Sequence, residues 1–269
     1  AEIYEIQLED PPAAFKAFVR ALPLDTRDEL TLASLERLAE QTGKWHEVAS
    51  RYDEAVQKKK EENPEDVVGL AKRSAVINEV QLDDVEAAIS RYQFVVDIDP
   101  SDAAPIEALD RLYDQTERWD ELAATLQKEA AIATTPEDVL NLQFRTGQVF
   151  QNQLGKVESA IEQYREIIAA APEYEPAVSA LEGMLAEGVR PIEIGEVLEP
   201  LYRMQGNWDQ LLNVQEVQVE YQQDVETGRL STGHAKALLG ITNLERRKSL
   251  RDRILEEGLS VRAAEEIAR

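Results

Sequence analysis

Apolar residues recur at intervals of three and four along most of this chain, which is the spacing of amphipathic helices. Leu109, Leu112 and Tyr113 form one such stripe. A second stripe consists of Ala88, Ile89, Tyr92, Val95 and Val96. No segment sustains the alternation of apolar and polar positions that indicates a half-buried strand. The pattern therefore predicts an all-α protein in which helical hairpins stack in one direction.

Prolines mark a regular period in this pattern. Pro64, Pro100, Pro136 and Pro172 follow one another at intervals of 36 residues. Each follows a helical pattern and precedes a new one, as expected when proline marks the junction between helices. The chain is therefore predicted to be a repeat protein.

The stretches before alternate prolines are also similar. Residues 81–96 and 153–168 share a Gln-Leu start, an Ala-Ile pair, a tyrosine and two aliphatic residues, each shifted by 72 positions. A third copy covers residues 7–22 at an offset of 74, with Thr26 in place of the proline. These copies predict one helix of the hairpin.

A second pattern alternates with the first and ends in Trp45, Trp119 and Trp208. The intervals between these tryptophans are 74 and 89 residues, so the last interval has room for one more short helix near 191–204, opened by Pro191. Because the tryptophans recur at equivalent positions, we expect them to be packing anchors between helices. The alternative is a tryptophan exposed in a groove that contacts a peptide.

The pattern Ala88, Tyr92, Val95 and Pro100 resembles the second helix of a tetratricopeptide repeat, and residues 160–172 repeat it. The resemblance covers residues 1–221. It implies a tetratricopeptide-like, right-handed solenoid of five to six helical hairpins, with a concave groove that binds proteins or peptides. The first helices of the hairpins would line that groove. The candidate groove residues on them are Lys72, Asn78, Asn141, Arg145 and Gln148.

The charge of the chain is distributed unevenly. The sequence has 53 acidic and 29 basic residues, a net charge of −24. Residues 222–269 carry a net +1 and residues 1–221 a net −25, which indicates a boundary near residue 222. Phosphate binding needs a basic surface, so this charge opposes binding of nucleic acid or anionic membrane by the whole chain. A protein partner of basic character is expected instead.

The composition excludes several kinds of chemistry. The chain has no cysteine, and His46 and His234 are 188 positions apart, so no local metal motif can be built from them. We therefore expect no catalytic site, no cofactor and no metal. No apolar run approaches 18 residues, and the acidic start is unlike a signal peptide, so we expect a cytoplasmic protein without a membrane span.

The C-terminal region departs from the repeat. Ser231 and Ser260 each follow a glycine-containing turn and suit a helix N-cap, which predicts three short helices over 231–239, 243–256 and 260–268. A pairing of Ser231 with His234 as nucleophile and base lacks an acid to orient the histidine, and the capping role already accounts for the serine.

Two strings in this region, at 230–239 and 258–262, resemble the ParB family of chromosome-partitioning proteins, and the resemblance spans about residues 225–269. It implies that Gly233, His234 and Lys236 lie near partition-site DNA. The nucleotide-binding motifs of that family are absent, and the repeat-like segment 208–221 stands where its recognition helix would be. DNA binding by this chain alone is therefore not expected.

The sequence favours a non-catalytic adaptor or scaffold with an acidic binding surface. One alternative is a DNA-segregation protein of the ParB kind. Another is that the C-terminal segment caps the solenoid or mediates self-association.

Overall fold

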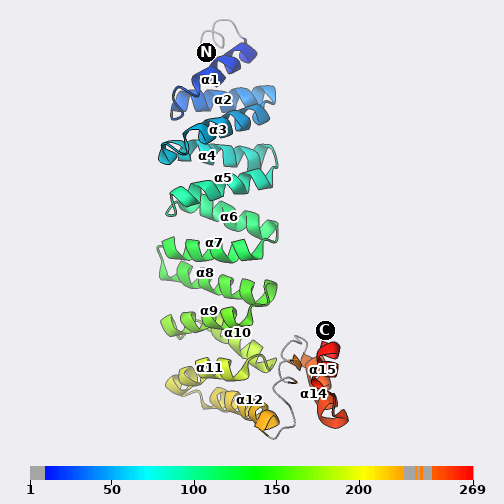
Figure 1. The fold of residues 1–269 in the computed structure, drawn as a ribbon. Helices are drawn as coiled ribbons and strands as arrows, with labels where there is room; N and C mark the ends of the chain where they lie inside the picture. The colour runs from blue at the N-terminus through cyan, green and yellow to red at the C-terminus, as the bar shows by residue number, and fades with distance from the viewer. Residues whose placement is uncertain (1–9, 227–233, 235–236, 239–243, 269) are drawn as a thin grey trace. The chain divides into compact units, whose positions relative to one another are not determined.

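The structure is a computed structural model, and it describes residues 10–226, 234, 237–238 and 244–268 (Figure 1). These residues include fourteen α-helices with their bounds and short 3₁₀ and π segments, and no strand occurs among them. The all-α prediction is confirmed. The chain divides into two compact units, residues 1–139 and 140–269, which we describe separately as unit 1 and unit 2.

Unit 1 is a run of helices in which each packs against the next (Figure 1). The α-helices are α1 (Pro11–Ala21), α2 (Glu29–Thr42), α3 (Trp45–Lys59), α4 (Val68–Val76), α5 (Val85–Ile98), α6 (Ala103–Gln115) and α7 (Trp119–Ile132). The 3₁₀ segment η2 (Pro64–Val67) leads into α4, and the π-helical segment η3 (Ile77–Gln81) extends it.

Local signals in the sequence account for the ends of these helices. The Asp28 carboxylate accepts a hydrogen bond from the Thr31 backbone N–H at 3.2 Å and thereby caps α2. Gly43 follows α2 with a φ of 68°, the left-handed conformation in which helices commonly stop. Apolar side chains from α1 to α5 then pack into one core, with Tyr52, Leu35 and Phe15 fully buried.

In unit 2, successive helices from α9 to α12 pack against one another, and α14 packs against α15. Its helices are α8 (Pro136–Gln148), α9 (Val157–Ala170), α10 (Glu175–Ala186), α11 (Pro191–Gln205), α12 (Trp208–Glu226), α14 (Leu244–Glu257) and α15 (Val261–Ala268), and the π-helical segment η4 (Val149–Gln153) extends α8. The additional helix predicted near 191–204 is α11, and Pro191 is its first residue.

The period read from the sequence recurs in the backbone. α5 and α9 are offset by 72 residues, as are the two π-helical segments η3 and η4. A left-handed residue follows each π-helical segment at the same offset, Asp83 with a φ of 53° and Gly155 with a φ of 62°. The repeat therefore extends to a backbone irregularity that the apolar pattern did not reveal.

The three tryptophans each begin a helix, but their environments differ. Trp45 and Trp119 are half-buried, as expected of packing anchors. Trp208 is 60% exposed, so the prediction is wrong there. The physical reason is that α12 packs along α10 and α11, and no other described helix packs along it.

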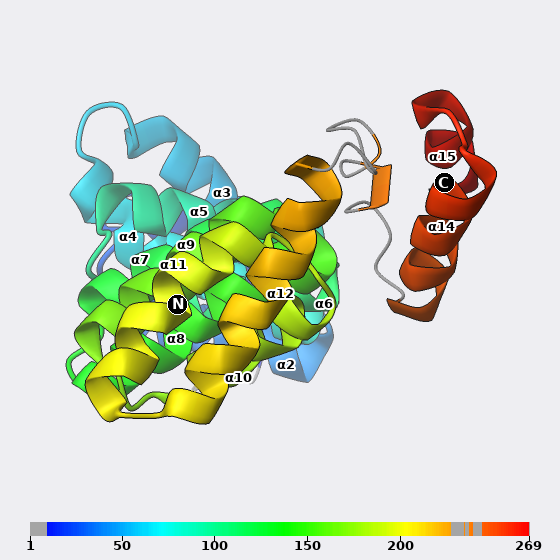
Figure 2. The same cartoon turned by 90° about the horizontal axis from the view of Figure 1, so that it is seen from below.

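The C-terminal helices α14 and α15 pair with each other (Figure 1 and Figure 2). Leu250, Ile254 and Ala264 form the centre of their small core. The Ala263 backbone N–H donates to Ser260 Oγ at 3.3 Å, which confirms that serine as an N-cap. The predicted helices 243–256 and 260–268 are confirmed.

Two other C-terminal predictions have a different outcome. Of the predicted helix 231–239, only residues 234, 237 and 238 are described, and these are helical. α12 runs without a break through residues 221 and 222, so the composition shift falls inside a helix rather than between elements.

No described helix is long and apolar enough to cross a membrane.

Candidate functional site

Two of the predicted groove residues, both in unit 1, contribute to the packing of the repeats. Lys72 on α4 forms an ion pair with Asp102, just before α6. Asn78 in η3 is only 5% exposed, so the expectation of an exposed side chain is wrong for it. Its Nδ2 donates to the Ser74 carbonyl at 2.8 Å, because the π-helical turn directs the amide inward.

The other three predicted groove residues belong to unit 2. The exposed Asn141 accepts a hydrogen bond from the Tyr174 hydroxyl at 2.8 Å. Arg145 is half-buried and has an interaction partner within the chain. Gln148 is exposed. Lys72 and Asn141 are thus held by contacts with other helices or turns, and Asn78 by a contact within its own helix.

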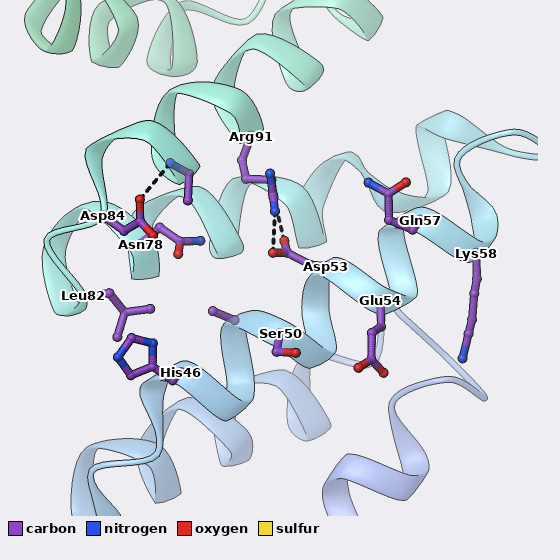
Figure 3. A pocket seen from close by; sticks show the side chains of 12 residues that line it. His46, Ser50, Asp53, Glu54, Gln57, Lys58, Asn78, Leu82, Asp84 and Arg91 are labelled. Atoms are coloured by element: carbon purple, nitrogen blue, oxygen red, sulfur yellow. Dashed lines mark hydrogen bonds and ion pairs between the residues drawn. The ribbon is translucent and has the colours of Figure 1, made fainter. Parts of the chain in front are cut away.

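A groove of about 840 Å³ lies between α3 and α5 in unit 1 (Figure 3). We refer to it as the α3–α5 groove. Side chains of α3 line one side, and Asn78, the turn after η3 and α5 line the other. The lining residues are His46, Ala49, Ser50, Asp53, Glu54, Gln57, Lys58, Asn78, Leu82, Asp84, Ala87 and Arg91.

An ion pair spans this groove (Figure 3). Arg91 on α5 donates from Nη2 and Nε to the two oxygens of Asp53 on α3, at 2.5 and 2.7 Å. Ser74 Oγ donates to the same carboxylate at 2.8 Å. These hydrogen bonds with Asp53 raise the pKa of Arg91. The carboxylate is satisfied by its neighbours, so the arrangement ties α3, α4 and α5 together and does not provide a catalytic acid or base.

A second set of contacts joins the first helices of successive hairpins. Arg73 on α4 donates to Glu36 on α2 at 2.9 Å and also pairs with Glu29 at 2.5 Å. Arg111 on α6 pairs in the same way with Glu79 in η3 at 2.5 Å. Arginine of one hairpin therefore binds glutamate of the hairpin before it.

Tyrosines of the second helices complete this set. Tyr52 donates to Glu36 at 3.2 Å, and Tyr92 donates to Glu79 at 2.9 Å. Burial, followed by the neighbouring glutamate, raises the pKa of both phenols. The sequence pattern indicated the recurrence of Tyr92 and Tyr164 but not the role of Tyr52 or of the glutamate and arginine partners, so it did not reveal this Tyr–Glu–Arg arrangement.

We define the first-helix surface as the exposed side of α2, of α4 with η2 and η3, and of α6 in unit 1. Its basic residues all have interaction partners within the chain; they are Arg37, Lys72, Arg73 and Arg111. Three exposed carboxylates on it have no partner in the described structure: Glu40, Glu65 and Glu107. A hollow of about 240 Å³ lies between α2 and α4. Of its acidic lining residues, Glu29 and Asp66 are paired with Arg73 and Arg27, and Glu65 has no partner in the described structure. The surface therefore presents uncompensated negative charge.

The residues implied by the ParB resemblance are described only in part. His234 is half-buried, whereas Gly233 and Lys236 lie outside the described residues. Among the described residues, no group of three or more His, Asp or Glu side chains could hold a metal ion.

Comparisons with known proteins agree with this architecture. The family model of the tetratricopeptide repeat matches residues 106–140, and that of the ParB HTH domain matches residues 208–269. The fold and these matches define a helical-repeat protein with tetratricopeptide-like repeats and a ParB-like C-terminal segment. The second match begins at Trp208 and so includes α12, whose first residues the repeat pattern places in the solenoid. Comparison with curated proteins finds no match.

Solved structures with a similar chain path include two of MamA and one of a thermophilic tetratricopeptide-repeat protein from Thermus thermophilus. One MamA structure is 14% identical, with a TM-score of 0.33, and the match covers 70% of this chain and 95% of that chain. The Thermus protein is 19% identical, with a TM-score of 0.29, and the match covers 65% of this chain and 90% of that chain. At these values the likenesses add nothing about function.

Proposed function

We propose that this protein is a non-catalytic interaction scaffold that binds a basic segment of a partner protein on the first-helix surface. The observation that carries the proposal is the charge state of that surface. Its basic side chains are all engaged within the chain, while Glu40, Glu65 and Glu107 are exposed without partners in the described structure. A partner that approaches this surface therefore meets unpaired carboxylates, whereas the lysine and arginine side chains there are already paired.

Electrostatics then determines how such a partner binds. The net charge of −25 on residues 1–221 attracts a basic segment over several ångströms and accelerates its association. Solvent-exposed charges are screened by salt, with a Debye length of about 10 Å at 0.1 M ionic strength. Binding should consequently weaken as the salt concentration increases.

The test uses the whole chain and two labelled probe peptides, one of alternating lysine and alanine and one of alternating glutamate and alanine. Fluorescence anisotropy gives the affinity at low and high salt. We expect the lysine peptide alone to bind, and its affinity to fall at least about tenfold between about 50 mM and 500 mM salt because of screening. The triple variant E40Q/E65Q/E107Q should bind it more weakly than the wild type.

The matched control is E173Q/E175Q/E187Q, which removes three exposed carboxylates of unit 2 that have no partner in the described structure. The two variants have the same net charge, so a difference between them reports on the first-helix surface and not on total charge. Equal weakening by both variants, binding of the glutamate peptide, or no binding at low salt would each contradict the proposal.

The ParB HTH match favours a second candidate function, DNA binding by the C-terminal segment. The sequence of α14 has five basic residues between positions 246 and 253, which is a suitable composition for phosphate contacts. A mobility-shift assay with a palindromic duplex at low salt tests it. No shift by the full chain would eliminate this candidate and would leave the scaffold proposal unaffected.

A further inference from the structure

Two valines are exposed on the first-helix surface. Val76, at the end of α4, is 48% exposed, and Val80, in η3, is 65% exposed. They lie about one turn apart on the same side of the helix, and we refer to them as the valine pair. Gly69 lies two turns before Val76 on this side, and a Cβ added to it would meet no atom within 4 Å. The exposed side of α4 therefore presents two apolar side chains with open space next to them along the helix.

The valine pair is not a requirement of the repeat. At the offset of 72 residues, its counterparts in unit 2 are Gln148 and Asn152, which are exposed and polar. On α2, the buried positions 34–35 and 38–39 match the buried positions of α4 at an offset of 36, which makes Glu40 the counterpart of the first valine. Because polar residues occupy this position in two other hairpins, stacking of the helices does not explain the valines.

A free carboxylate of α6 flanks the valine pair. Two ion pairs join α4 and η3 to α6: Lys72 with Asp102, and Glu79 with Arg111. Glu107 lies near the middle of the segment between the two α6 partners, and the first valine lies near the middle of the segment between the two α4 and η3 partners. Glu107 is exposed and has no partner in the described structure. It therefore lies beside the valine pair, at about the level of its first member.

A free carboxylate of α2 flanks the valine pair on the other side, since α4 lies between α2 and α6 (Figure 1). Arg73 pairs with both Glu29 and Glu36, so it lies level with the stretch of α2 between them. The first residues of α2 and of α4 line the same hollow, so the two helices run in the same direction. Val80 is seven residues after Arg73, and the same step along α2 from the middle of that stretch reaches Glu40. Glu40 is exposed and has no partner in the described structure.

We propose that the basic segment bound by the first-helix surface crosses α4 in an extended conformation, with an apolar side chain on the valine pair. Basic side chains two positions before and after the apolar residue then meet Glu40 and Glu107. This inference rests on the proposed function and adds the order of residues that the partner must have.

The dimensions of an extended chain agree with this arrangement. Side chains two positions apart point to the same side of such a chain, and four residues advance it by about 13 Å. Two steps between neighbouring helices amount to about 20 Å. The lysine and glutamate side chains at the two ends cover the difference. The apolar residue gains contact with the valine pair, and the two ends gain opposite charges.

The test starts from the alternating lysine–alanine peptide of the scaffold test and replaces its central lysine by leucine or by serine. A third peptide exchanges this leucine with the neighbouring alanine, which turns the leucine to the opposite side of an extended chain. Fluorescence anisotropy with the full chain at low salt gives the affinities. We expect the leucine peptide to bind about five- to tenfold more tightly than the serine peptide, because its leucine is partly buried. The exchanged peptide should bind like the serine peptide.

The variant V76Q/V80N gives the valine pair the residues that occupy the equivalent positions of unit 2. It should bind all three peptides with equal affinity, because only the charges remain to hold them. The matched control L24Q/L212Q replaces two exposed leucines outside the first-helix surface and should keep the preference of the wild type. Circular dichroism verifies that the helix content of both variants is unchanged.

The scaffold proposal and this inference fail in different ways. If no lysine-containing peptide binds at low salt, the scaffold proposal is wrong, and this inference is wrong with it. If the three peptides bind the wild type equally, or if V76Q/V80N keeps the preference for the leucine peptide, the scaffold proposal stands and the valine pair is not a contact for the partner. Equally tight binding of the leucine peptide and the exchanged peptide would overturn the extended arrangement.

Discussion

At the residue scale, the repeat uses one backbone conformation with different side chains. The residue two positions before each helix-starting tryptophan has a positive φ: Gly43 at 68°, Glu117 at 55° and Gly206 at 69°. Only glycine adopts this left-handed conformation without a steric penalty. Glu117 is therefore strained relative to its two counterparts.

This comparison gives a prediction for Glu117→Gly. Relief of the left-handed strain should increase the free energy of unfolding by about 0.5–1 kcal/mol, a gain reduced by the greater freedom of glycine in the unfolded chain. Gly206→Ala should lower it by about 1 kcal/mol through φ alone, because an added Cβ at Gly206 meets no atom within 4 Å. Urea denaturation measures both. A lower stability of Glu117→Gly would show that Glu117 makes contacts that outweigh its strain.

The buried tyrosines make stability depend on alkaline pH. Burial raises the pKa of Tyr164 to about 12, from an ordinary value of 10.0. A raised pKa means that the folded state retains the proton, so the stabilisation is complete below the unfolded pKa and is lost as pH rises through the folded one. We expect the free energy of unfolding to fall between about pH 10 and pH 12.

Tyr164→Phe removes this ionisation and should make the fall less steep. Its folded-state cost is loss of the hydrogen bond to Gln151 at 2.9 Å. Urea denaturation from about pH 8 upwards, followed by circular dichroism, compares the two proteins across the range in which the phenol ionises. If the wild type and Tyr164→Phe have the same pH profile, ionisation of Tyr164 is not the cause of the alkaline loss of stability.

At the element scale, contacts between neighbouring hairpins carry much of the specificity of stacking. Arg73 of α4 joins Glu36 of α2, which also accepts from Tyr52 of α3, so three helices meet at one carboxylate. The equivalent acceptor in unit 2 is Gln151, which binds Tyr164 without a charge. A neutral amide requires no arginine, and none is observed at this position in the described contacts.

Removal of the arginine from the contacts among Arg73, Glu36 and Tyr52 should destabilise the folded protein. Arg73→Ala leaves Glu36 partly buried without its cation and should lower the free energy of unfolding by about 1–2 kcal/mol. In a double-mutant cycle with Glu36→Gln, we expect a coupling energy of about 1 kcal/mol. The exposed pair Arg51–Glu54 serves as the control and should give less than about 0.5 kcal/mol. Equal coupling energies would mean that the Arg73 pair is an ordinary surface contact.

At the scale of the whole molecule, the dominant feature is the excess of negative charge on residues 1–221. Like charges repel within the folded repeats more than in the expanded unfolded chain, and salt screens that repulsion. The many short-range ion pairs between helices oppose this effect, but exposed pairs contribute little each.

We therefore expect added salt to stabilise the protein. The midpoint of thermal unfolding should rise by a few degrees between about 20 mM and 200 mM potassium chloride, over which the screening length falls roughly threefold. Differential scanning calorimetry measures the midpoint. E40Q/E65Q/E107Q should show a smaller rise, because it carries less charge to screen. A lower midpoint in salt would show that attractive ion pairs dominate.

The sequence predicts the fold of this protein better than it predicts the residues of a binding site. Apolar spacing and the prolines at intervals of 36 residues were enough for the helices and their hairpin arrangement, because burial of one helix face is a local property of the sequence. The candidate groove residues were less predictable. Asn78 and Lys72 are polar residues on a predicted first helix, but Asn78 lies in a π-helical turn and bonds to Ser74 of α4, and Lys72 pairs with Asp102 of the following hairpin.

The sequence by itself determined the repeat, the helix junctions, the acidic character of residues 1–221 and the ParB-like C-terminal segment. Only the tertiary structure decided which charged residues stay free, which helices meet at Glu36 and Glu79, and that Trp208 is exposed whereas Trp45 and Trp119 are half-buried. The physical reason is that equivalent sequence positions acquire different neighbours. A side chain is buried or paired when another hairpin packs on it, and that depends on the position of its own hairpin in the stack.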